Sequence, residues 1–132
     1  MYDSKEVLTS HVENMLTDMF DELVRDTTGQ FDPGAAFLEE DVRFVVNCLW
    51  NTFKRYEFVF EHYKELTGHD DSTVLMQYLI SAFGWGDGIE FWSFEGIDKF
   101  VFEALTDVAG RERFAKFDVF YDEKLNKLRF DR

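Results

Sequence analysis

The sequence has few of the residues that mark secreted or disulfide-stabilised proteins. It contains one cysteine, Cys48, among 132 residues. A single cysteine cannot form a disulfide within the chain, whereas secreted domains of this size often carry several. The first residues also lack the basic and apolar segments of a secretory signal. We therefore expect a cytoplasmic protein that works in a reducing compartment.

Long hydrophobic runs and basic residues are also scarce. The most apolar stretch, residues 44–50, is interrupted by Asn47 and is far shorter than the roughly 18 residues of a membrane-spanning helix. Only 14 Lys and Arg oppose 27 Asp and Glu, which gives a net charge of -13. A field of this sign repels phosphate backbones and anionic lipid. The expected partner is therefore a basic protein surface, with no direct nucleic-acid or membrane binding.

What the chain does contain is enough apolar material for one folded domain spanning residues 1–132. Hydrophobic residues make up 45% of the sequence, and 16 of them are Phe. Apolar side chains at spacings of three and four predict helices near residues 4–25, 37–66, 72–83 and 97–108. The second of these is Phe-rich and apolar on most sides, so we expect it to be central and to break near residues 56–60.

Alternating apolar and polar residues predict a C-terminal β-hairpin over residues 117–131, with its turn at 123–126. Residues 89–94 are compatible with a further strand, and the Gly- and Pro-containing segment 27–35 is the clearest loop. The predicted fold is therefore α+β: mainly helical, about four helices around the Phe-rich one, with a small antiparallel sheet.

The acidic residues are concentrated in the first third of the chain. Residues 1–41 carry eleven acidic side chains against two basic ones, whereas residues 110–132 carry seven basic against five acidic. A solvated, solubilising face explains a net charge of about 2–8 in magnitude, and this chain exceeds it. We therefore treat the excess as a candidate partner-binding surface, made of Asp18, Asp21, Glu22, Asp26, Asp32, Glu39, Glu40 and Asp41.

A Gly-rich segment around residues 84–88 provides a second candidate contact. Trp85 lies within it and Trp92 follows shortly after, and exposed Trp side chains often dominate binding interfaces. Packing of both indoles into the core is the alternative. A phosphate-binding loop is excluded because such loops follow a strand and open a helix, and here a helix comes first.

Two sets of residues have side chains that catalysis can use, but neither set has the spacing of a known catalytic or metal site. Cys48 lies in the most apolar helix, with no His at helical contact spacing to act as its base. His62, Glu65 and His69 are suitable zinc or iron ligands, but their spacing matches no metal signature and Gly68 interrupts the helix between them. We predict no enzyme activity, cofactor or metal, and keep a small metal-dependent enzyme using these three residues as an alternative.

These observations favour a non-enzymatic binding protein whose carboxylates occupy the nucleic-acid-binding surface of another protein. In composition the chain resembles phage-encoded DNA mimics that inhibit restriction or CRISPR systems. It is similar in the same respect to the acidic immunity proteins of nuclease toxins, which we keep as an alternative. A subunit of a larger assembly that docks through residues 85–94 is a third class, and homodimerisation is left open.

Overall fold

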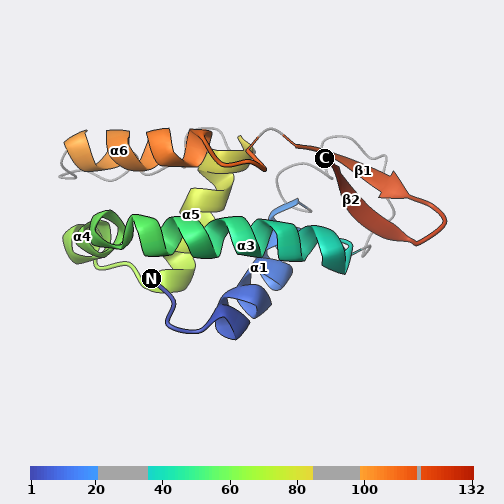
Figure 1. The fold of residues 1–132 in the computed structure, drawn as a ribbon, viewed down its shortest axis with the longest axis horizontal. Coiled ribbons are helices and arrows are strands. Elements are labelled where there is room, and N and C mark those ends of the chain that lie inside the picture. Colours follow the sequence, from blue (N-terminus) through green and yellow to red (C-terminus); the bar gives the residue numbers. More distant parts are fainter. Residues whose placement is uncertain (21–35, 85–98, 116) are drawn as a thin grey trace.

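The computed structural model describes residues 1–20, 36–84, 99–115 and 117–132 (Figure 1). Within these ranges the chain is mainly helical with a two-stranded antiparallel sheet at its C-terminal end, which confirms the predicted α+β class. None of the helices in these ranges is long and apolar enough to cross a membrane. In chain order, the elements are α1 (Lys5–Phe20), α3 (Glu39–Arg55), α4 (Glu57–Thr67), α5 (Asp71–Phe83), α6 (Lys99–Gly110), β1 (Asp118–Asp122) and β2 (Lys127–Asp131).

The boundaries of the helices follow local sequence signals. The helical pattern over residues 37–66 is divided at Tyr56, within the segment where a break was expected, because its backbone (φ -112°, ψ 27°) departs from helical values. Gly68 ends α4 in the left-handed conformation (φ 74°) that glycine adopts without strain. Asp70 then caps α5 by accepting a hydrogen bond at 2.9 Å from the backbone N–H of Thr73. The predicted loop at 27–35 and strand at 89–94 lie outside the described residues.

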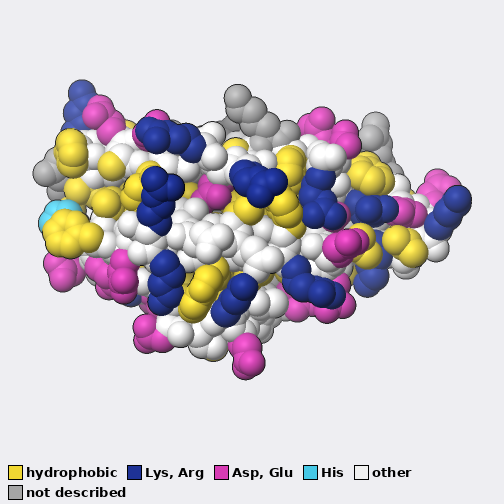
Figure 2. Space-filling model, viewed as in Figure 1, with side chains coloured by type: hydrophobic (Ala, Val, Ile, Leu, Met, Phe, Trp, Pro, Cys, Tyr) yellow, Lys and Arg dark blue, Asp and Glu magenta, His cyan; other side chains and the backbone are white. Residues whose placement is uncertain are grey.

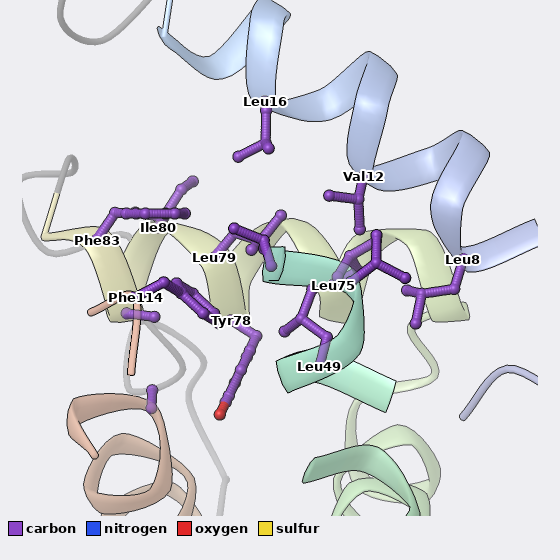
Figure 3. Packing of buried hydrophobic residues seen from close by; sticks show 14 of the residues in the cluster. Leu8, Val12, Leu16, Leu49, Leu75, Tyr78, Leu79, Ile80, Phe83 and Phe114 are labelled. Atoms are coloured by element: carbon purple, nitrogen blue, oxygen red, sulfur yellow. The ribbon is translucent and has the colours of Figure 1, made fainter. Parts of the chain in front are cut away.

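The helix with the largest share of buried residues is α5, which lies behind α3 in Figure 1 and contacts both α1 and α6. Its apolar side chains fill the space between the other helices. Val12 and Leu16 of α1 point toward Leu75 and Leu79 of α5, with Leu49 of α3 alongside them (Figure 3). The core is therefore shared between α5 and the Phe-rich α3, rather than formed by α3 alone.

Phenylalanine rings fill the two ends of this core. On the α4 side, Phe53 packs edge-on against Phe60 and Tyr78, with ring centroids 4.9 and 5.7 Å apart. On the hairpin side, Phe130 stacks on Phe37 at 4.9 Å and on Phe83 at 5.3 Å. Aromatic contacts of this kind add about 0.5–1.5 kcal/mol each beyond the burial of area. Core packing thus explains part of the abundance of Phe, since Phe58 and Phe100 are exposed.

The C-terminal hairpin confirms the predicted strands and turn. Residues 118–122 pair antiparallel with residues 127–131, and the connecting turn contains Asn126 in the left-handed region (φ 52°). The second strand also pairs with the segment before α3, because Leu128 donates its N–H to the carbonyl of Ala36 and accepts from the N–H of Leu38, at 2.9 and 2.8 Å. The hairpin is thereby attached to the start of α3.

We predict that Phe53→Ala lowers the free energy of unfolding by about 3–5 kcal/mol, because the substitution opens a cavity in a fully buried aromatic cluster. The matched control is Phe58→Ala on α4, whose side chain is 85% exposed and should change stability by less than about 0.5 kcal/mol. Urea unfolding of both variants measures the difference. Equal midpoints for the two variants would show that Phe53 is not part of the core.

Candidate functional site: an acidic edge and a polar pocket

Four of the predicted acidic contact residues lie in the described part of the chain: Asp18, Glu39, Glu40 and Asp41. The other predicted contacts, namely Asp21, Glu22, Asp26, Asp32, Trp85 and Trp92, lie outside it. The described part of the candidate site therefore lies at the end of α1 and the start of α3.

Asp18, Glu39 and Glu40 form what we call the acidic edge. Asp18 is exposed near the end of α1, and Glu39 and Glu40 are exposed in the first turn of α3. The two helix ends are in contact through their buried rings, since Phe20 and Phe37 pack edge-on with ring centroids 5.7 Å apart. Exposed acids at a helix start also complement the helix dipole, which provides a structural role for Glu39 and Glu40. The edge thus places exposed carboxylates on two helix ends that are in contact through these rings.

A groove of about 300 Å³ runs between α1 and α3 beside this edge. Glu13 of α1 and Glu39 of α3 line it together with Lys5 and Arg43, so its walls carry both signs of charge. Glu39 also pairs with Arg43 at 3.3 Å, and both side chains are exposed. Glu13 was not among the predicted contact residues. It reaches this site because α1 packs against α3, which the charge pattern along the chain does not show.

The prediction that Asp41 contacts a partner is wrong, because its side chain is fully buried. Its carboxylate accepts a hydrogen bond from the backbone N–H of Phe130 at 2.9 Å. The guanidinium of Arg132 lies 3.2 Å from one carboxylate oxygen, and that of Arg129 lies 4.0 Å from the other. Asp41 therefore joins α3 to the hairpin and is not available to a partner. Its spacing from Val45 places it on the apolar stripe of the helix, a signal that the sequence did contain.

Basic side chains gather on the face that α3 presents. Figure 2 shows Lys and Arg running across the middle of the face that α3 presents, with many Asp and Glu toward its margins. Several of these cations lie over aromatic rings: Arg113 and Arg132 over Phe44 at 5.2 and 5.1 Å, and Lys54 over Trp50 at 4.6 Å. The α3 face thus carries a local basic band despite the net charge of -13, and this band meets the acidic edge where Arg43 pairs with Glu39.

A polar group that sequence reasoning missed lies where α3 approaches the end of α6. Glu112 accepts hydrogen bonds from the hydroxyls of Thr52 and Tyr78, at 2.5 and 2.6 Å, and both bonds end on its Oε1. Burial raises the pKa of Glu112 above its ordinary value, although these two bonds oppose the shift. A pocket of about 250 Å³ opens beside this carboxylate, lined by Asn51, Thr52, Arg55, Tyr56, Val108, Arg111 and Glu112.

The residues of the alternative enzyme hypotheses show no catalytic arrangement. Cys48 is half-buried on α3, and burial raises the pKa of its thiol, which disfavours the nucleophilic thiolate. His62 and Glu65 are exposed on α4, while His69 packs beside the ring of Tyr63 at 6.3 Å. Within the described ranges, no three His, Cys, Asp or Glu side chains come together as metal ligands.

In comparisons with known proteins, no family model, no curated protein and no solved structure matches this chain.

We predict that Asp41→Asn destabilises the protein by about 3 kcal/mol, because two guanidinium groups lose the buried charge that they face. The two Arg side chains remain 32% and 33% exposed, so water replaces part of that interaction. The neighbouring Glu40→Gln removes an exposed charge and should cost less than about 1 kcal/mol. Chemical denaturation distinguishes the two, and equal losses would contradict a special role for Asp41.

We predict that Glu112→Gln leaves stability at neutral pH unchanged or higher. A carboxyl whose pKa is raised on folding binds its proton more readily in the folded protein, so its ionised form opposes folding above that pKa. Gln keeps an oxygen for Thr52 and Tyr78 to donate to. The gain should shrink as the pH is lowered toward the pKa of an unfolded Glu. Glu123→Gln, an exposed substitution with the same charge change, provides the control in thermal unfolding.

Proposed function

We propose that this chain is a non-enzymatic acidic binding protein that inhibits a partner protein by occupying its positively charged, nucleic-acid-binding surface. The observation that carries the proposal is the acidic edge: Asp18, Glu39 and Glu40 are exposed and lie on helix ends held together by the packing of Phe20 against Phe37. Carboxylates on a rigid base replace the phosphates that such a surface would bind, and little ordering entropy is lost on binding.

The charge of the whole chain supports the same proposal. A net charge of -13 attracts a basic partner over a distance of about one Debye length and accelerates the encounter. It repels free nucleic acid, so the protein competes with nucleic acid for the partner instead of binding it.

This mode of action is that of phage-encoded inhibitors of restriction or CRISPR enzymes, acting in the cytoplasm. The immunity protein of a nuclease toxin would use the same charge complementarity on a different class of target. The two are distinguished by the partner, which is a restriction or CRISPR enzyme in the first case and the nuclease domain of a toxin in the second.

The test begins with affinity capture from a host lysate at low and high salt, followed by association kinetics with the retained protein. The variant Asp18→Asn, Glu39→Gln, Glu40→Gln should slow association by about tenfold at low ionic strength while changing dissociation little, because charge mainly steers the encounter. Short duplex DNA or RNA should compete with the parent protein for the same site.

The matched control is Glu57→Gln, Glu65→Gln, Glu103→Gln, which removes three exposed charges from α4 and α6, at the other end of α3 (Figure 1). If both triple variants slow association equally, net charge and not the acidic edge determines binding. If no basic protein is retained at low salt, or nucleic acid fails to compete, the proposed function is wrong.

A further inference from the structure

The pocket beside Glu112 has features that the proposed inhibitor function does not use. Its volume of about 250 Å³ is just below the range of about 300–1,000 Å³ typical of sites for drug-sized ligands. A ligand of this size is a small metabolite rather than a nucleotide. The lining comes from the last turns of α3, the break at Tyr56, Val108 near the end of α6, and Arg111 and Glu112 directly after that helix.

Glu112 provides the negative group of this pocket. Within the described part of the chain, both hydrogen bonds that it accepts end on Oε1. Oε2 accepts neither of these two bonds, and Glu112 belongs to the lining of the pocket. A carboxylate with one oxygen held by Thr52 and Tyr78 is fixed in orientation, and an incoming ammonium group with three donors is its natural partner.

Arg55 provides the positive group. Its guanidinium lies 5.5 Å from the ring of Tyr56, and it forms no ion pair with any residue in the described ranges. In contrast, Arg111 on the opposite wall is already paired with Asp107. In a chain with nearly twice as many acids as bases, an uncompensated guanidinium beside a pocket is available to an anionic group, which it binds through two parallel hydrogen bonds.

We propose that this pocket binds a small zwitterion, an amino acid whose ammonium group is bound by Glu112 and whose carboxylate is bound by Arg55. The amide of Asn51 lies on the same lining and can donate to the carboxylate as well. Phosphate dianions are disfavoured by the charge of Glu112, and simple amines by that of Arg55. The ligand must therefore carry both charges close together, as an α-amino acid does.

The experiment is saturation-transfer NMR with each of the twenty common amino acids at millimolar concentration, using the full chain. At least one should bind, and acetate or methylammonium alone should fail to displace it. Arg55→Gln and Glu112→Gln should each weaken binding by at least about tenfold, since each removes a charge-assisted contact. Lys54→Gln is the control: Lys54 adjoins Arg55 but does not line the pocket, and its removal should leave affinity within about twofold.

Three outcomes would overturn the proposal: no amino acid binds, acetate displaces the bound amino acid as effectively as a second amino acid does, or the pocket variants bind as tightly as Lys54→Gln. Glu112→Gln retains an oxygen for its two hydroxyl donors, so the variant remains folded, and far-ultraviolet circular dichroism verifies this. Arg55 is exposed, so its substitution leaves the core intact.

Discussion

A buried carboxylate joins the hairpin to α3, beside the backbone pairing of Leu128 with Ala36 and Leu38. Asp41 occupies a position on the apolar stripe of α3, accepts a hydrogen bond from the backbone N–H of Phe130 and forms ion pairs with Arg129 and Arg132. A buried charge is tolerated only when it is paired and hydrogen-bonded. This requirement positions β2 against α3, and β2 in turn brings Phe130 into contact with Phe37 and Phe83. A polar contact therefore supports the aromatic packing at this end of the core.

Local signals made most of the fold predictable. Asp70 and Gly68 mark the boundary between α4 and α5, and alternation over residues 118–131 indicates the hairpin. The polar contacts of the interior could not be predicted in the same way. Glu112 meets Thr52 across 60 residues, and Asp41 meets Phe130 across 89. Such pairs depend on how the elements pack, and no local pattern in a single sequence reveals that packing.

The candidate sites show the same distinction. Charge counting found the acidic edge, because exposure of charged side chains is the default outcome. It misplaced Asp41, whose helical spacing pointed inward, and it overlooked the basic band, because those cations come from segments far apart in the chain. A net charge describes the field at long range. Close to the surface, the local charges determine which ligands approach, since charges more than about 8 Å apart are screened at physiological salt.

The pairing of Leu128 with Ala36 and Leu38 has a consequence for the order in which the chain folds. The hairpin itself is local, and such units form within about 1–10 µs. Docking the hairpin requires closure of a loop of some ninety residues. This closure lowers the entropy of the chain before the new contacts can stabilise the folded structure. Until then, the carboxylate of Asp41 and the edge of β2 remain hydrated. We therefore expect the helices to assemble first and the C-terminal strand to dock late.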